Sequence, residues 1–104
     1  MTLDELYTIL SKVLPTTYLA WPEGEAPSLP WIAIVQTGTD NFGADGIAYG
    51  IINDIDVELY TKTKDPVTEG LVEKALTDTG VFWQKTETYI EAEKCLEIIY
   101  SLEV

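Results

Sequence analysis

The stretch IAYGIINDIDVELY, residues 47–60, decides the fold, because its side chains alternate in character with a period of two. The odd positions are mostly apolar. The even positions in its second half are acidic or aromatic: Asp54, Asp56, Glu58 and Tyr60. Such alternation is typical of a strand with one face on the core and the other toward solvent. The length of the stretch predicts a strand that bends or extends past its sheet.

A short amphipathic helix is predicted near the N-terminus. Thr2 can cap its first turn, and Glu5, three residues later, completes a capping box. Apolar residues then recur at helical spacing: Leu3, Leu6, Tyr7, Leu10, Val13 and Leu14. Pro15 ends the helix, because the residue before a proline disfavours helical backbone.

A second helix is predicted after the long strand. Asp65 is suited to cap it, and Pro66 fits its first helical position. Its expected apolar stripe consists of Val67, Leu71, Val72, Ala75 and Leu76. Gly80 fits the position that follows the last turn, where a left-handed backbone is common.

Four further strands are expected, at residues 18–21, 31–37, 81–85 and about 89–102, with a connection rich in Gly, Asp and Asn at residues 38–46. In the last strand, one face holds Leu96, Ile98, Tyr100 and Leu102, and the other holds Glu93, Glu97 and Glu103. Runs of strands joined by short loops favour an antiparallel sheet. The fold prediction is therefore α+β: a mostly antiparallel sheet of four to five strands, with two helices packed on one face, in the order α-β-β-β-α-β-β. Residues 1–104 are expected to form a single domain.

The charge and composition of the chain exclude several classes of function. The chain of 104 residues has a formal net charge of −12, from 18 acidic residues and 6 basic residues that are all lysines. Without arginine, and with this charge, ordinary nucleic-acid binding is disfavoured. The chain has no histidine, which removes the usual general base and the commonest zinc ligand. We therefore expect no enzymatic activity, no cofactor and no catalytic residue.

The sequence also suggests a location. Cys95 is the only cysteine, so the chain gives no sign of an oxidising compartment. The acidic N-terminus lacks the basic, then apolar, pattern of a signal peptide. No stretch has the 18 to 20 apolar residues of a membrane span. We expect a cytoplasmic protein without membrane contact.

The acidic side chains of Asp54, Asp56 and Glu58 allow three interpretations. They could chelate a hard cation such as Mg²⁺ or Ca²⁺, form the solvated face of a half-buried sheet, or form a wall that faces DNA without binding it. Residues 40–46 superficially resemble a calcium loop but lack its alternating ligands and its bidentate glutamate. Because no set is complete, no residue is assigned as a metal ligand.

Aromatic residues are concentrated beside a loop rich in proline. Trp21 precedes Pro22, and Trp31 follows Pro30. These tryptophans could pack at a sheet edge. They could also anchor an interface, since Trp and Tyr are enriched at binding hot spots.

Several segments together resemble the small tail-terminator or tail-completion proteins of long-tailed bacteriophages and prophages. They are residues 30–34, 41–49, 55–65 and 89–94, and the two predicted helices are in register with the pattern. The resemblance covers nearly the whole chain. It implies a subunit of a ring, expected to be a hexamer, that caps the tail-tube protein, joins it to head–tail connector proteins and lets DNA pass without specific binding. It also implies a location in the host cytoplasm during assembly, and then in the virion.

Within that resemblance, the acidic strand and the glycine-rich connection are candidates for an interface or for the lumen of the ring. The candidate residues are Asp40, Asn41, Phe42, Asp45, Tyr49, Asp54, Asp56 and Glu58. An acidic lumen would repel DNA and keep it from adhering during passage. Three alternatives stay open: an acidic DNA mimic that inhibits a host nucleic-acid enzyme, a head–tail connector component other than the terminator, and a metal-dependent hydrolase that uses the acidic stripe.

Overall fold

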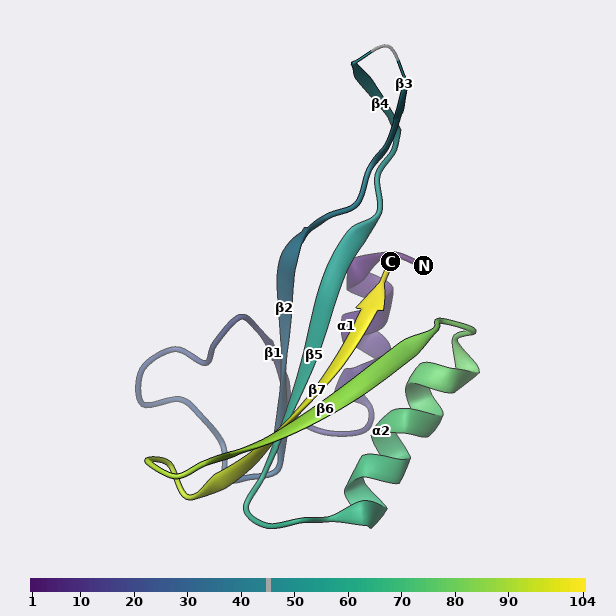
Figure 1. The fold of residues 1–104 in the computed structure, drawn as a ribbon. Helices are drawn as coiled ribbons and strands as arrows, with labels where there is room; N and C mark the ends of the chain where they lie inside the picture. The colour runs from purple at the N-terminus through teal and green to yellow at the C-terminus, as the bar shows by residue number, and fades with distance from the viewer. Residues whose placement is uncertain (45) are drawn as a thin grey trace.

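The computed structural model describes residues 1–44 and 46–104 and confirms the predicted α+β fold. The elements in chain order are α1 (Leu3–Ser11), β1 (Thr16–Tyr18), β2 (Trp31–Thr39), β3 (Phe42–Ala44), β4 (Ile47–Gly50), β5 (Asn53–Thr61), α2 (Pro66–Asp78), β6 (Trp83–Ile90) and β7 (Cys95–Glu103). Figure 1 shows the sheet, the two helices and a narrow hairpin that projects beyond them.

Five strands form the main sheet, in the order β1-β2-β5-β7-β6. The pairs β2–β5, β5–β7 and β7–β6 are antiparallel, and only the three-residue β1 runs parallel to its neighbour β2. The acidic and apolar strand of the sequence is thus central, with β2 on one side and β7 on the other. The expected count of four to five strands and their mostly antiparallel pairing are correct.

The core lies between one face of the sheet and both helices. The helices contribute Leu6 and Leu10 from α1 and Val72 and Leu76 from α2. The strands contribute Ile32, Ile34, Ile55, Val57, Leu59, Ile98, Tyr100 and Leu102. On β5 these are the odd positions, so the period-two pattern correctly identified the core face.

Both helix starts follow their capping residues. The backbone N–H of Glu5 donates to Thr2 Oγ1 at 3.1 Å, and that of Thr68 donates to Asp65 Oδ1 at 3.2 Å. Gly80 follows α2 with a φ of +82°, a conformation that favours glycine. Both helix starts and the end of α2 are therefore as predicted, whereas α1 ends at Ser11 rather than at Pro15.

Three of the predicted strands had wrong boundaries. The first short strand lies at Thr16–Tyr18, and the chain leaves it at Leu19, whose φ is +62°. The last hairpin turns at residues 91–94, where Lys94 has a φ of +54°. Residues 86–88, expected to be the turn, lie inside β6 and pair with β7. The sequence pattern misled here, because β6 lies at the edge of the sheet and most of its side chains are exposed and polar.

The expected apolar stripe of α2 was only partly correct. Val72 and Leu76 are buried, but Val67 is 76% exposed and Leu71 is 53% exposed. The buried position in the first turns is instead Glu69, which is 3% exposed. Packing against lysines of neighbouring segments, described below, overrides the hydrophobic pattern.

The long strand extends past the sheet, as its length predicted, but it is interrupted at Ile51 and Ile52. Beyond this break, β4 pairs with β3 in a separate antiparallel two-stranded sheet. We call residues 40–52 the arm. A hydrogen bond from the Asp40 N–H to the Ile52 carbonyl, 2.8 Å long, closes its base. The arm stands at the top of Figure 1, and it gives the molecule one long dimension of 48 Å against 29 and 23 Å.

Candidate assembly surfaces

The face of the sheet that the helices leave uncovered is acidic, and we call it the open face. Asp54, Asp56 and Glu58 project from β5 onto it as half-buried side chains. Strand register adds two more carboxylates, because Glu103 lies opposite Asp54, and Glu97 lies opposite Tyr60. None of these five carboxylates takes part in an ion pair of the described chain. The open face therefore holds negative charge that lysines of the same chain do not compensate.

Tyr60 stands between two carboxylates of the open face. Its Oη lies 2.9 Å from Glu58 Oε1 and 2.6 Å from Glu97 Oε2. A phenol has one hydrogen, so it cannot donate to both carboxylates at once. Burial and the neighbouring carboxylates Glu97 and Asp56 raise the pKa of Glu58, although the hydroxyl of Tyr60 opposes this. Desolvation and both hydrogen bonds raise the pKa of Tyr60.

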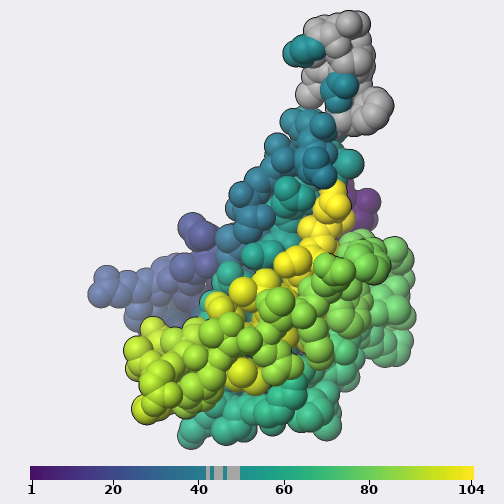
Figure 2. Space-filling model, viewed as in Figure 1, coloured from purple at the N-terminus to yellow at the C-terminus, as the bar shows by residue number. Residues whose placement is uncertain are grey.

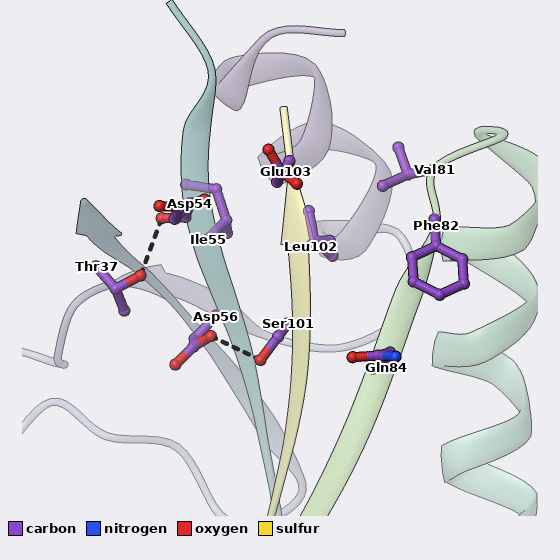
Figure 3. Close-up of a pocket in the computed structure, with 10 residues that line it drawn as sticks. All are labelled: Thr37, Asp54, Ile55, Asp56, Val81, Phe82, Gln84, Ser101, Leu102 and Glu103. Atoms are coloured by element: carbon purple, nitrogen blue, oxygen red, sulfur yellow. Dashed lines mark hydrogen bonds between the residues drawn. The ribbon is translucent and has the colours of Figure 1, made fainter. Parts of the chain in front are cut away.

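At the other end of the open face lies a shallow cavity of about 470 Å³ (Figure 3). Its walls come from β2, β5, β6 and β7. Ser101 Oγ donates to Asp56 Oδ1 at 3.0 Å, and Thr37 Oγ1 donates to the carbonyl of Asp54 at 3.3 Å. Phe82, which is 78% exposed, stands at the side of the cavity. The cavity lining combines carboxylates, hydroxyls and one exposed aromatic ring.

The tryptophans pack within the chain. The ring of Trp21 packs edge-on against that of Trp31, with the ring centroids 5.9 Å apart. The ring of Trp31 packs in turn against that of Tyr60, with a centroid distance of 4.6 Å. This aromatic row covers the end of the open face nearest residues 20–30. Trp83, on the helix side, packs edge-on against Tyr100. For Trp21 and Trp31, the packing interpretation explains the position of both rings.

The helix side of the sheet also carries charge, in an arrangement we call the ionic cluster. Glu69 Oε1 accepts from Lys64 Nζ at 2.9 Å and from Lys85 Nζ at 3.2 Å. Lys85 also binds Glu73, and Lys64 also binds Glu87. Burial alone would raise the pKa of Glu69, but the two lysines hold it below its usual range. The cluster ties α2 to β6 and to the segment before α2.

The structure brings together only some of the residues predicted from sequence. Asp54, Asp56 and Glu58 share the open face, whereas Asp40 and Asn41 lie at the base of the arm. Phe42 and Tyr49 belong to β3 and β4 of the arm, and Asp45 lies outside the described residues. Sequence reasoning placed Tyr60 on the same strand face as Glu58 but did not predict that Glu97 and Glu103 join this surface. The alternation along each strand shows which residues share a face of that strand. The sequence does not show the pairing register between β5 and β7, which places Glu97 beside Tyr60 and Glu58.

Across residues 1–44 and 46–104, no group of three or more Asp, Glu or Cys side chains is arranged to hold a metal ion. In the same part of the chain, no helix is both long enough and apolar enough to cross a membrane.

These features define a small α+β protein with one helical layer, an acidic open face and a projecting arm. Among solved structures, it is similar in fold to a chain in the "Virion of native gene transfer agent (GTA) particle". The TM-score is 0.62 at 13% sequence identity, and the match covers 94% of this chain and 81% of that chain. No protein-family model and no curated protein sequence matches the chain. At this identity, the likeness shows a shared fold.

Proposed function

We propose that this protein is a structural component of a phage-like virion, and that it acts there as the tail terminator. In this role it forms a ring, a hexamer, that caps the tail tube, stops its growth and joins it to the head–tail connector. The observation that carries the proposal is the fold shared with a gene transfer agent virion chain over most of both chains. The role requires surfaces rather than a reaction, so no residue is assigned to catalysis.

The charge distribution is consistent with a subunit of a ring through which DNA passes. The open face gathers uncompensated carboxylates, including Asp54, Asp56 and Glu58, and most lysines are engaged elsewhere. A lumen of this sign repels the phosphate backbone and prevents adhesion during passage. We propose that these three residues, with Asp40 and Asp45, contribute to such a lumen.

The test is a tube-assembly experiment with a tail-tube protein from the same genome. Tubes assembled with the protein should stop growing and carry a ring at one end in negative-stain micrographs. Tubes assembled without it should grow to indefinite lengths. Uncapped tubes in both samples would refute the terminator role. Binding to a connector ring instead of the tube would favour another head–tail component.

A second arm of the test addresses the DNA-mimic alternative. The protein is mixed with a DNA nuclease from the host, and cleavage is followed as protein is added. A terminator should leave cleavage unchanged. Stoichiometric inhibition by a monomer or dimer would instead identify a DNA mimic.

A further inference from the structure

The main sheet has two uncovered edges. At one edge β6 pairs with β7 on one side only, and residues 84–89 are exposed along its length. At the other edge, β1 covers only residues 32–34 of β2. Within the described chain, no strand pairs with the outer side of β2 at residues 35–39. In Figure 2 the light green residues of β6 lie on the visible surface, with no other element over them.

Neither a proline nor a bulge protects the long edge against pairing. Proteins commonly guard edge strands with proline, a bulge or an outward lysine, because free N–H and C=O groups attract another strand. β6 contains no proline, and its register with β7 is regular over eight residues. Its one lysine, Lys85, is held on the helix side by Glu69 and Glu73. The edge is therefore available for pairing.

Charge indicates what pairs with these edges. The chain carries −12 overall, but residues 35–39 are uncharged, and β6 holds one lysine and one glutamate. Two copies of so acidic a chain repel one another over most of their surfaces. They can approach most closely where each is neutral, and both uncovered edges are neutral. The partner that fits them is a second copy of this chain.

Strand direction makes the two edges complementary. Three successive antiparallel pairs connect β2 to β6, so the two strands run in opposite directions. When two copies lie side by side in the same orientation, β6 of one meets β2 of the next as an antiparallel pair. The sheet then continues from copy to copy, with all helices on one side and all open faces on the other.

We propose that copies of this protein associate head to tail by pairing β6 with residues 35–39 of β2 in the next copy. The contact uses two different edges, so repetition closes a ring when the rotation per copy allows it. The inference rests on the proposed ring function and specifies its contact. In such an assembly, the acidic open faces of all copies lie on the same side. The register shift of β2 between Gln36 and Gly38 limits the new ladder to a few residues.

The test is disulfide crosslinking in a Cys95→Ala background, since Cys95 is the chain's one native cysteine. Thr37→Cys on β2 is combined in turn with Gln84→Cys, Thr86→Cys and Thr88→Cys, whose positions alternate along β6 with those facing the helices. The protein is assembled on tail tubes and oxidised, then separated on a non-reducing gel. At least one pair should give a ladder that reaches the ring size, and each single-cysteine variant should stay monomeric.

A matched control combines Thr86→Cys with Ser11→Cys, an exposed residue at the end of α1 that lies on neither edge. This pair should give no ladder. Dimers from a β6 single-cysteine variant would overturn the proposal in favour of β6 pairing with itself. Rings in micrographs without crosslinking of any edge pair would overturn the edge contact and leave the terminator function standing. Absence of both rings and crosslinks would overturn both.

Salt provides an independent readout. Ring formation through neutral edges, between chains that otherwise repel, should strengthen as ionic strength rises, because screening weakens the repulsion. Light scattering after size-exclusion chromatography should show a larger assembled fraction at 0.5 M than at 0.05 M NaCl. A contact made by ion pairs between copies would respond in the opposite direction, and that result would overturn the proposal.

Discussion

The two faces of the main sheet hold carboxylates in opposite surroundings. On the helix side, Glu69 is 3% exposed and lies between Lys64 and Lys85. On the open face, Glu58 and Glu97 share one hydroxyl, that of Tyr60, and neither forms an ion pair with a lysine among residues 1–44 and 46–104. The pKa of Glu69 is accordingly lowered and that of Glu58 is raised. The chain thus neutralises the charge that it buries against its helices and leaves the charge of its open face uncompensated.

The largest expected effect comes from breaking the ionic cluster. Glu69→Gln removes the anion that two lysines surround, and breaking a buried pair in this way costs about 3 kcal/mol or more. Because Lys64 and Lys85 are 49% and 33% exposed, they can turn to water, and the loss should fall at the low end. Urea unfolding of the monomer measures it. The matched control is Asp78→Asn, which breaks the exposed pair with Lys74 and should change stability by about 0.5 kcal/mol or less. Equal losses in the two variants would contradict the prediction.

The same comparison predicts an acid sensitivity. Glu69 has a folded-state pKa below its unfolded value, so its contribution is full above about pH 4.3. The contribution is lost as the pH falls through the folded-state pKa. Below pH 4.3, the stability of the native chain should decline more steeply than that of Glu69→Gln. Urea midpoints measured between pH 3 and pH 6 test this, and parallel curves would contradict it.

The sequence predicted one side of this comparison better than the other. Alternation along residues 53–61 placed Asp54, Asp56 and Glu58 on one face, because a strand has a fixed period and the core requires the other face. The ionic cluster was not predictable in this way. It joins α2 to β6 across 16 residues of chain, from Glu69 to Lys85, and such contacts depend on how the elements pack. Hydrophobic spacing instead favoured Val67 and Leu71, which the structure leaves exposed.

The arm shows the same limit. Composition predicted a hairpin connection in residues 38–46, and the length of the following strand predicted an extension past the sheet. The break at Ile51 and Ile52 was not predicted, since both residues continue an apolar stretch. Ile51 is nevertheless 69% exposed, because it lies before the start of β5 and outside the main sheet. Local propensity indicated the strands, but it did not show where the main sheet, and with it the core, ends.

An intermediate effect is expected where the ionic cluster meets the core. Tyr100 is fully buried and donates from its hydroxyl to Glu73 Oε2 at 2.9 Å. Tyr100→Phe keeps the ring that packs against Trp83 but removes this hydrogen bond, at a cost of about 1 kcal/mol. Tyr89→Phe, at a position that is 52% exposed, serves as the control and should be close to neutral. Thermal unfolding measures both, and a Tyr100→Phe variant as stable as the native chain would show that the bond contributes nothing to folding.

The smallest effect should have the opposite sign, because the open face is not arranged for stability. Glu58→Gln removes one of the two carboxylates at the Tyr60 hydroxyl and lets the amide donate a hydrogen bond there. Relief of like-charge repulsion across strands should stabilise the monomer by about 0.5 kcal/mol at pH 7.

The same substitution should depend on pH. Because the pKa of Glu58 is raised in the folded state, its ionised carboxylate lowers the free energy of unfolding of the native chain above that pKa, and this loss disappears as the pH falls below about 4.3. The gain from Glu58→Gln should therefore vanish in acid, whereas Glu93→Gln in the exposed β6–β7 turn should leave stability at pH 7 nearly unchanged. A destabilised Glu58→Gln variant at pH 7 would mean that this carboxylate stabilises the fold, and the contrast between the two faces would then be lost.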